Sequence, residues 1–436
     1  MKILYVGDNR NRVNWGCRAT SKALKTLIFE NNIHELTGTI DGKEVDGGFT
    51  KINFSRIISV KWFKIIERRS RKYSIFRLLH YIILLFGEEQ DFISEDIDKS
   101  VAFFEKNHQY FPKLSQINKH LGKCEAIVIN GEGDMIFTSP PRRNALFYLM
   151  LLSLANKRGK LTFYVNAMIS DPPNQKRNES TVMSMLKVFV NCNKITLRDP
   201  FSYEILSELD KNRTLKFEYI PDALFTWVKY FKDEKLSVPI IGDSIIPWPE
   251  NDYYYGKYDF SKPYICISGS SLAAWNQEAA TEGYIQLVNK LKELEIQMYL
   301  VPTCVGDQFL SKVSRKTDTP IIPVDIPIVA GACILANSLL FVSGRFHPSI
   351  LASLNGTPCI FMGSNSHKTH SLQKMLGVEI PKEYGAIPNT EDVHNIYLTA
   401  LSILKTKSKN SRQMIINKVM DLAKQSRQVT DIFDNY

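Results

Sequence analysis

The chain has no paired cysteines. Its seven cysteines are odd in number, lie singly and include no Cys-x-x-Cys pair, so their spacing indicates neither a zinc site nor a disulfide framework. Most of them lie in or beside apolar runs, where a free cysteine behaves as a small hydrophobic residue. This usage is typical of a reducing cytoplasm. The seven are Cys17, Cys124, Cys192, Cys266, Cys304, Cys333 and Cys359.

Long hydrophobic runs are also missing, and no stretch reaches the roughly 20 apolar residues of a membrane-spanning helix. The first eight residues, MKILYVGD, become polar too early for a secretory signal peptide. No known nucleic-acid-binding motif accompanies the basic residues. The sequence therefore predicts a cytoplasmic protein without a nucleic-acid partner, for which any membrane association is peripheral.

The composition is that of a soluble globular protein, with 44% hydrophobic and 23% charged residues. The 55 Lys and Arg exceed the 45 Asp and Glu, which gives a net charge of +10. This excess favours an anionic partner, such as a phosphorylated substrate or an anionic lipid. A length of 436 residues is too great for one ordinary core and indicates two domains.

Strands and helices alternate in the first half of the sequence. Apolar runs of strand length end in polar residues, and helical stretches separate them. This alternation predicts an α/β fold with a parallel, doubly wound sheet. The predicted strands are 1–7, 126–129, 161–165, 194–197 and 217–220, and the predicted helices are 18–31, 146–155 and 200–209.

A second α/β block begins near Tyr264. The stretch from Pro239 to Tyr258 is rich in Pro, Gly, Asp and Tyr, which is typical of a linker. We therefore expect an N-terminal domain over 1–240, a C-terminal domain over 259–410, and a last helix within 411–436 that packs back on the domains. Further predicted strands are 297–301, 339–342 and 358–362, and further helices are 278–294, 349–356 and 411–427.

One segment of the first domain, about 51–115, departs from this alternation. Residues 51–90 hold nine Lys and Arg against three Glu, and the apolar run Leu78–Phe86 lies among them. Basic residues beside apolar and aromatic ones at helical spacing fit a helix lying on an anionic membrane surface. The alternative is an inserted helical hairpin whose apolar face packs on the first domain.

Arg345 and His347 lie where a predicted buried strand, 339–342, passes into the helix 349–356. Ligands bind at this carboxyl edge in open α/β sheets, and a helix N-terminus favours anions. Arginine adds a fork suited to phosphate or carboxylate, and histidine can transfer protons near neutral pH. The pattern indicates a site for a small anionic donor with acid chemistry; the alternative is a capped helix with a surface Arg and a packed His.

Six short motifs occur in order along the chain: Asn14-Trp15-Gly16-Cys17-Arg18-Ala19, Asn130-Gly131-Glu132-Gly133-Asp134, Leu197-Arg198-Asp199 followed by Ser202, Pro221-Asp222, Gly344-Arg345-Phe346-His347, and Asn355-Gly356-Thr357-Pro358 leading to His367-Lys368. Together they resemble the polysaccharide pyruvyl transferase family. The resemblance spans residues 1 to about 375, apart from the basic insertion.

The resemblance implies a GT-B-like fold: two Rossmann-like domains facing across a cleft, with the acceptor on the first domain and the donor on the second. It implies transfer of a pyruvyl group from phosphoenolpyruvate to a sugar of a bacterial surface polysaccharide, or of its lipid-linked precursor, as a ketal. The family's residues for phosphoenolpyruvate map to Arg198, Arg345 and His347. No metal or other cofactor is required, and the expected location is the cytoplasm, with peripheral contact at the inner face of the plasma membrane.

One residue departs from the family pattern. Pro348 follows His347, where the family usually has a small residue such as alanine. A His-Pro pair is a nucleotide-binding element of GT-B enzymes that use CMP-linked 2-keto acid sugars. A GT-B glycosyltransferase with a nucleotide-sugar donor is therefore the alternative function, and a non-catalytic binding protein of the same fold is a third.

Pyruvyl transfer assigns a role to each candidate residue. A proton must reach C3 of phosphoenolpyruvate, for which His347 is the candidate acid, and Arg198 and Arg345 would neutralise the two anionic groups. Ser270 and Ser271 would add hydroxyls and backbone N–H groups for phosphate. The candidates for base or for acceptor binding are Glu132, Asp134, Asn14 and Lys368. Each of these residues also has a purely structural interpretation. Glu132 and Asp134 would belong to a tight turn, Asn14 to an ordinary turn, and Lys368 would be solvated. Asp199 would cap the helix that begins at Pro200.

Overall fold

The computed structural model describes residues 1–42, 44–45, 51–53, 58–85, 89–231, 258–406, 409–434 and 436. They form two compact units. The first contains Met1–Asn9, Phe29–Leu197 and Ile205–Glu218, and the second contains Arg10–Ile28, Arg198–Glu204 and Tyr219–Tyr436. The second unit thus takes two segments from the N-terminal half of the sequence. The expected linker, Pro239 to Tyr258, lies outside the described residues except for Tyr258.

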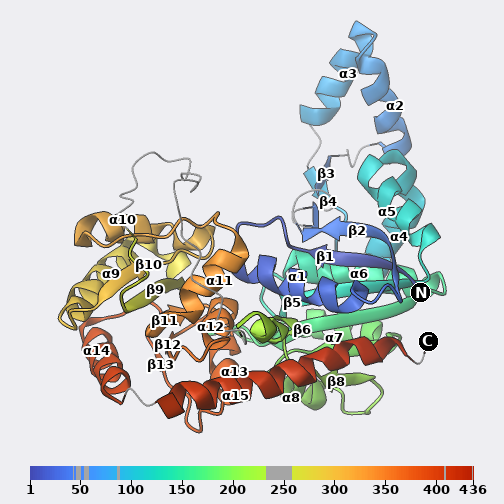
Figure 1. Ribbon diagram of the computed structural model, residues 1–436. Helices are drawn as coiled ribbons and strands as arrows, with labels where there is room; N and C mark the ends of the chain where they lie inside the picture. The colour runs from blue at the N-terminus through green and yellow to red at the C-terminus, as the bar shows by residue number, and fades with distance from the viewer. Residues whose placement is uncertain are drawn as a thin grey trace. The chain divides into compact units, whose positions relative to one another are not determined.

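A six-stranded sheet forms the centre of the first unit, in the order β2-β1-β5-β6-β7-β8 (Figure 1). The strands from β2 to β7 pair in parallel, as expected for a doubly wound sheet, although β2 is not among the predicted strands. The chain passes from β1 to β2 on one side and later to β5 on the other, so the carboxyl ends of β1 and β5 form a topological switch point, where ligands bind in such sheets. The strands are β1 Lys2–Asp8, β2 Glu35–Asp41, β5 Ala126–Ile136, β6 Leu161–Ser170, β7 Lys194–Leu197 and β8 Phe217–Tyr219.

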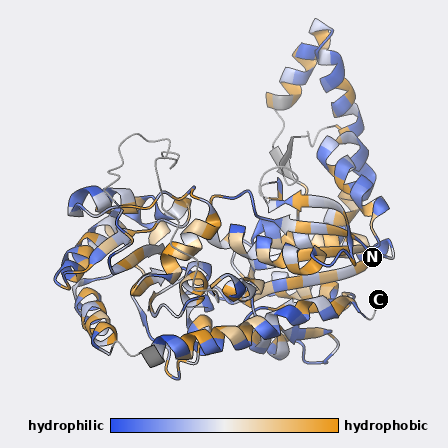
Figure 2. Cartoon of the chain, in the orientation of Figure 1, coloured by the Kyte–Doolittle hydropathy of each residue, from blue (hydrophilic) through white to orange (hydrophobic). Residues whose placement is uncertain are grey.

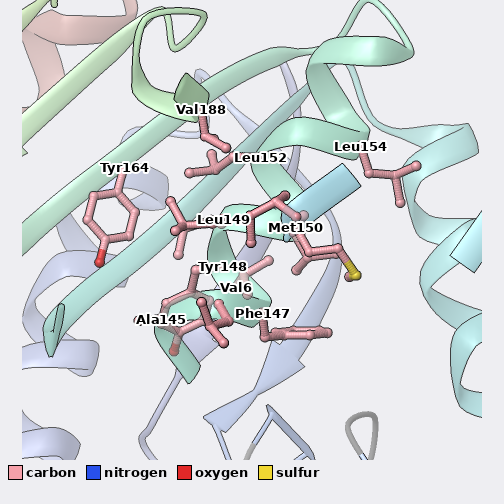
Figure 3. Packing of buried hydrophobic residues seen from close by; sticks show 14 of the residues in the cluster. Val6, Ala145, Phe147, Tyr148, Leu149, Met150, Leu152, Leu154, Tyr164 and Val188 are labelled. Carbon is pink, nitrogen blue, oxygen red and sulfur yellow. The ribbon is translucent and has the colours of Figure 1, made fainter. Parts of the chain in front are cut away.

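The core of this unit lies between the sheet and α6, Arg143–Lys157. This helix is apolar around most of its circumference, and its residues from Ala145 to Leu152 are all buried, as expected for a helix covered on all sides. Figure 3 shows Leu149 and Tyr148 of α6 near Val6 of β1 and Tyr164 of β6, which belong to the same cluster.

Two helices of this unit, α4 Ile97–Asn107 and α7 Glu179–Phe189, have capped N-termini. The side chain of Asp96 accepts a hydrogen bond from the backbone of Lys99, and that of Asn178 accepts one from Thr181; each satisfies a free N–H of a first turn. Helix α4 packs on α6. The helices are α4 Ile97–Asn107, α5 Pro112–Lys123, α7 Glu179–Phe189 and the C-terminal part of α8 Pro200–Leu209, with a 3-10 turn η2 at His108–Tyr110.

The basic insertion contains a helical hairpin, α2 Val60–Ser70 and α3 Ser74–Leu85, whose two helices pack on each other (Figure 1). Before and after it, β3 Lys51–Asn53 pairs antiparallel with β4 Glu89–Asp91. Arg56 and Phe86, two residues of the predicted basic and apolar runs, lie outside the described residues. In the described part of the chain, no helix has both the length and the apolarity needed to cross a membrane.

A five-stranded sheet forms the centre of the second unit, in the order β10-β9-β11-β12-β13, and all of its neighbours pair in parallel. Here the switch point lies between β9 and β11, where Ser270 pairs with Gly344. Arg345 follows directly at this edge. The strands are β9 Tyr264–Ser270, β10 Gln297–Leu300, β11 Leu340–Gly344, β12 Cys359–Met362 and β13 Glu383–Tyr384.

Helices from three parts of the sequence complete the second unit. The last long helix, α15, packs on the 3-10 segment η3 and on α12. The helices are α1 Trp15–Phe29 (its last residue in the first unit), α9 Gln277–Lys292, α10 Phe309–Thr317, α11 Ile328–Ala336, α12 Phe346–Ser353, α13 Lys368–Met375, α14 Thr390–Lys405 and α15 Lys409–Ser426, with 3-10 segments η3 Ala223–Phe231, η4 Ala273–Trp275, η5 Val305–Asp307 and η6 Arg427–Phe433.

Two elements differ from the sequence prediction at the candidate site. Strand β5 does not end at residue 129 but continues to Ile136, so Glu132 and Asp134 lie within a strand rather than in a turn after it. A shift in the pairing with β6 occurs between Glu132 and Met135, where Gly133 and Asp134 lie. Helix α12 begins at Phe346, earlier than predicted, because proline fits a first helical turn. His347 and Pro348 therefore belong to the helix, and Arg345 is its N-cap residue.

Candidate functional site

Arg198, Asp222 and His347 form a buried cluster within the second unit. Arg198 follows β7, Asp222 precedes η3, and His347 lies in the first turn of α12. Nη1 of Arg198 lies 3.0 Å from Nε2 of His347 and 3.3 Å from Oδ2 of Asp222. Nε2 of His347 lies 3.1 Å from the same carboxylate oxygen. The structure thus brings together Arg198 and His347, two of the predicted residues, and adds an aspartate.

Asp222 is held rigidly and stays ionised. Its Oδ1 accepts hydrogen bonds from Thr20 Oγ1 at 2.7 Å and from the Leu224 backbone at 2.9 Å. Burial alone would raise the pKa of this carboxyl, but His347 and Arg198 outweigh it, and the pKa falls to about 2. The backbone carbonyl of Asp222 accepts a hydrogen bond from Ser426 Oγ at the end of α15. The C-terminal helix therefore supports the segment that carries this carboxylate.

His347 has a partner at Nε2 in either protonation state. A protonated Nε2 donates to the Asp222 carboxylate, and an unprotonated Nε2 accepts from Arg198. The other side of the ring lies against Gly16, because a Cβ on that glycine would stand 2.5 Å from Nδ1 of His347. Only glycine leaves room for the ring here. Contacts on both sides therefore hold the ring in one position.

Arg198 keeps hydrogen-bonding capacity beyond these contacts. Its side chain is 3% exposed, and its guanidinium lies 4.7 Å from the centre of the Phe346 ring. Within the described ranges, Nε of Arg198 is buried and has no hydrogen-bond partner. A buried N–H without a partner is costly, so this donor marks a place where a ligand can bind.

Asp199 and His367 form a second buried pair next to the first. Nε2 of His367 lies 2.9 Å from Oδ1 of Asp199, and Phe201 stacks on the imidazole. Asp199 also caps α8, because it accepts a hydrogen bond from the Ser202 backbone at 3.0 Å, as the sequence suggested. Burial would raise the pKa of Asp199, but the bond and charge of His367 and the bonds from Ser202 lower it. The dipeptide Arg198-Asp199 thus positions one histidine with each side chain.

Arg345 forms an ion pair with Asp307 that is separate from the Arg198–Asp222–His347 cluster. Its Nη2 lies 2.5 Å and its Nε 3.2 Å from Oδ1 of Asp307. Burial would lower the pKa of Arg345, but the Asp307 carboxylate raises it. Oδ2 of Asp307 accepts hydrogen bonds from the backbone and hydroxyl of Thr303. The guanidinium is therefore fixed at the switch point of the sheet, with its charge balanced by Asp307.

Ser271 and Lys368 meet at Asn365. Nζ of Lys368 donates to Oδ1 of Asn365 at 2.7 Å, and Ser271 Oγ donates to the same oxygen at 3.1 Å. Ser270 instead donates its hydroxyl to the backbone carbonyl of Gly363. The structure therefore places the two serines and Lys368 along the carboxyl ends of β9 and β12, with the lysine tethered rather than free in solvent.

Asn14 caps helix α1. Its Oδ1 accepts a hydrogen bond from the Cys17 backbone at 3.2 Å, and this contact brings Gly16 into the turn that meets His347. The next residue, Trp15, is buried, and its indole N–H donates to the carbonyl of Val324 at 2.6 Å. Asn14 therefore fixes the turn that contains Gly16.

Glu132 and Asp134 belong to the first unit. Oε1 of Glu132 accepts hydrogen bonds from Asn9 at 2.6 Å and from Asn130 at 3.1 Å, at the switch point between β1 and β5. Glu132 and Asn166 both have positive φ angles, 40° and 52°, which are rare for such residues within strands. Strain of this kind is concentrated at functional sites. Asp134 interacts electrostatically with Arg142.

The sequence reasoning missed the acidic partners of the site. Asp222 lies in one of the quoted motifs, and its position after the strand 217–220 is the signal that could have assigned it. Asp307 lies outside all six motifs, and no sequence signal pointed to it, whereas Thr303 lies at the polar end of the predicted strand 297–301. His367 was noted only as a neighbour of Lys368. In the described part of the chain, no group of three or more His, Cys, Asp or Glu is placed to hold a metal ion.

These two units define the class of protein. The fold resembles the UDP-GlcNAc 2-epimerase of Neisseria meningitidis solved with UDP-GlcNAc, with a TM-score of 0.57, 10% identity and 100% of both chains covered. The corresponding epimerase of Methanocaldococcus jannaschii gives 0.54, 12% identity and 100% of both chains. The S. aureus MnaA–UDP structure gives 0.55, 13% identity, 100% of this chain and 96% of that one. The fold is therefore GT-B-like, with two Rossmann-like sheets, as expected.

The comparison with protein families gives a more specific assignment. Residues 14–366 match the model of the polysaccharide pyruvyl transferase family. The chain belongs to this family and is a transferase, as the six motifs predicted. The comparison with curated proteins finds no match.

Proposed function

We propose that the protein transfers the pyruvyl group of phosphoenolpyruvate to a sugar of a bacterial surface polysaccharide or of its lipid-linked precursor. Family membership supports pyruvyl transfer to a polysaccharide in general. The observation that supports this donor is the buried Arg198–Asp222–His347 cluster, which holds a cation with a spare N–H donor beside a histidine. An anionic ligand and a proton donor are what the reaction needs side by side.

The proposed reaction needs one proton at carbon and the release of phosphate. Two sugar hydroxyls form bonds to C2 of phosphoenolpyruvate, the C2–O bond to phosphate breaks, and C3 becomes a methyl group. The two sugar hydroxyls release two protons. One of them replaces the proton that C3 takes up, and the other leaves with the phosphate as hydrogen phosphate. His347 supplies the proton to C3, and Asp222 and Arg198 keep its ring in place before and after the transfer.

The remaining residues divide between donor and acceptor. Arg345 presents a fixed guanidinium at the β9–β11 switch point, and Ser270, Ser271 and Lys368 line the neighbouring strand ends. We assign these groups to the anionic oxygens of the donor. Glu132 at the β1–β5 switch point is assigned to the acceptor, as base or as a partner of its hydroxyls, together with Asp134. Asn14 acts by positioning Gly16.

A lipid-linked acceptor would be found at a membrane. We therefore place the enzyme in the cytoplasm, working at the inner face of the plasma membrane. The net charge of +10 favours contact with an anionic surface.

The test is calorimetric titration of the full chain with phosphoenolpyruvate, followed by mass spectrometry of a glycan acceptor after incubation. We expect donor binding and a product heavier by one pyruvyl ketal. Arg198→Ala should weaken donor binding by about 10- to 100-fold, because a lost charged hydrogen bond costs about 1.5–3 kcal/mol. Arg427→Ala, an exposed arginine of the same unit, is the matched control and should bind normally.

The alternative donor is a nucleotide sugar, and the same titration separates the two. Two epimerases of similar fold were solved with UDP-GlcNAc, one of them also with UDP, and the His347-Pro348 pair suggests a CMP-linked sugar. Heat released by CMP or UDP but not by phosphoenolpyruvate, with a product heavier by a whole sugar, would overturn the proposal. Binding of either donor without turnover on any acceptor would indicate a binding protein.

A further inference from the structure

We propose that the α2–α3 hairpin docks on an anionic phospholipid bilayer, with the exposed apolar face of α3 in the interfacial region and the basic connection between the helices on the lipid headgroups. This inference deepens the membrane location proposed above by naming the element and its partner. It does not depend on which donor the enzyme uses.

Helix α3 exposes an apolar face. On a helix of 3.6 residues per turn, Ile75, Leu78, Leu79, Ile82 and Leu85 fall on one side, and all five are exposed. Ile75 is 74% and Leu85 63% exposed. In Figure 2 this helix carries hydrophobic colour along its length. A contiguous apolar face in contact with water marks a surface that binds a partner.

The exposed face is not the one that holds the hairpin together. Ile83 and Phe76 of α3 pack on Phe63 and Ile66 of α2. His80 of α3 also lies against Phe63, at 5.5 Å between ring centres. These contacts use the opposite side of α3. The outer residues are therefore left over after the hairpin has formed its own small core.

The hairpin that carries this face is strongly basic. Residues 58–85 contain seven Lys and Arg but one acidic residue, Glu67, and Glu67 is paired with Lys64 at 2.7 Å. The helix end and connection hold four exposed cations, and a fifth follows in α3. They are Arg68, Arg69, Arg71, Lys72 and Arg77. Each basic residue near an anionic membrane surface contributes about 1 kcal/mol to binding.

Aromatic residues complete the pattern. Trp62, Tyr73 and Tyr81 are each more than half exposed on this hairpin, and Trp and Tyr are the side chains that favour the membrane–water interface. A helix of 12 residues is about 18 Å long, too short for a hydrocarbon core of about 30 Å. Helix α3 therefore fits a position in the plane of the interface.

The charge argues against a second copy of the chain as the occupant. Two hairpins placed face to face would bring two clusters of Arg and Lys together, and like charges at a contact oppose association. An anionic bilayer offers the complementary charge together with an apolar layer. It is the partner that matches both properties of the hairpin.

The test is cosedimentation of the full chain with phosphatidylcholine vesicles that contain phosphatidylglycerol, and with pure phosphatidylcholine vesicles, at low salt. We expect binding to the anionic vesicles alone. The quadruple variant Arg68→Glu, Arg69→Glu, Arg71→Glu, Lys72→Glu and the triple variant Ile75→Ser, Leu78→Ser, Leu85→Ser should each reduce the affinity by at least about tenfold. The exposed pair Lys312→Glu, Lys316→Glu on α10 is the charge control.

Absence of vesicle binding by the wild-type chain at low salt would overturn the inference. Wild-type affinity in either hairpin variant would overturn it as well. It would also be overturned if light scattering showed that the wild-type chain is a dimer and the triple variant a monomer. Circular dichroism checks that the variants are folded. Titration with phosphoenolpyruvate on the same variants keeps the two proposals apart, because loss of vesicle binding with intact donor binding concerns only the hairpin.

Discussion

At the scale of single residues, the site depends on acidic side chains that hold the cationic ones. Arginine or histidine after a parallel strand can be recognised from sequence, because both residue and position are informative. Their partners cannot be recognised in this way. Asp307 lies 38 positions before Arg345 in the chain and 2.5 Å from it in space, and no local pattern records such a pairing. The sequence therefore pointed to the cations as candidates but not to the carboxylates that pair with them.

His347 should contribute mainly to rate. His347→Ala leaves Arg198 and Asp222 paired with each other, so donor affinity should change little, whereas turnover should fall by about 100- to 10,000-fold, the usual contribution of a general acid. Gly16→Ala should act through the same histidine, because its new Cβ would stand 2.5 Å from Nδ1 and must push the ring from its place. Single-turnover rates beside donor titrations measure both effects.

The control for this pair of variants is His394→Ala on the exposed side of α14, which should keep full rate. If His347→Ala retained its rate, histidine would not be the acid. If Gly16→Ala kept the rate while the His347 variant lost it, the packing of the ring against Gly16 would not matter for catalysis.

At the scale of secondary structure, the predictions were wrong where contacts between distant residues override a local sequence preference. Gly131 and Gly133 suggested a turn, but β5 continues through both, because its pairing with β6 extends to Ile136. Within such a strand a glycine can be needed because a neighbouring side chain leaves no room for a Cβ. A Cβ on Gly131 would lie 2.6 Å from the Tyr164 ring. Strands β10, β11 and β12 and helix α8 followed their apolar patterns and lie within a few residues of the predicted positions.

Arg345 joins two elements, since it caps α12 and pairs with Asp307 at the end of η5. Arg345→Ala would leave a buried carboxylate without its cation, and breaking such a pair costs about 3–5 kcal/mol. We expect this variant to lose stability as well as donor affinity, and Arg345→Lys to retain more of both. Urea denaturation of the two variants measures the free energy of unfolding.

The matched control is Arg315→Ala, an exposed arginine of α10, which should change stability by less than about 0.5 kcal/mol. Unchanged stability of Arg345→Ala would show that Asp307 finds another partner. In that case the guanidinium would be available for the donor at little structural cost.

At the scale of the whole molecule, the sequence predicted the two α/β halves but not how segments are shared between the two compact units. Residues 10–28 and 198–204 belong to the second unit although their neighbours in the chain belong to the first. Strand–helix alternation reports which elements form, whereas the assignment of a helix to one core or another depends on contacts between distant residues. The domain limits at 240 and 259 stay a prediction.

The free energy of unfolding of the whole molecule should decrease at acid pH as Asp222 becomes protonated. Its pKa in the folded state is about 2, below the value of about 3.9 in an unfolded chain. A lowered pKa means that the ionised form stabilises the fold, so the contribution is fully present above about pH 4 and is lost as the pH falls from 4 through 2. The difference corresponds to about 2–3 kcal/mol.

Asp222→Asn tests this linkage. The variant should be less stable than the wild type at pH 7, because Arg198 and His347 lose their carboxylate, and the difference should shrink between pH 4 and pH 2. The free energy of unfolding from urea titrations at several pH values measures it. Asp199, whose pKa is also lowered, titrates in both proteins and cancels in the comparison.

The exposed Asp421→Asn on α15 is the control and should follow the wild type throughout. A difference between Asp222→Asn and wild type that stays constant from pH 7 to pH 2 would mean that Asp222 is not ionised in the folded protein, and the arrangement proposed for His347 would then lack its anion.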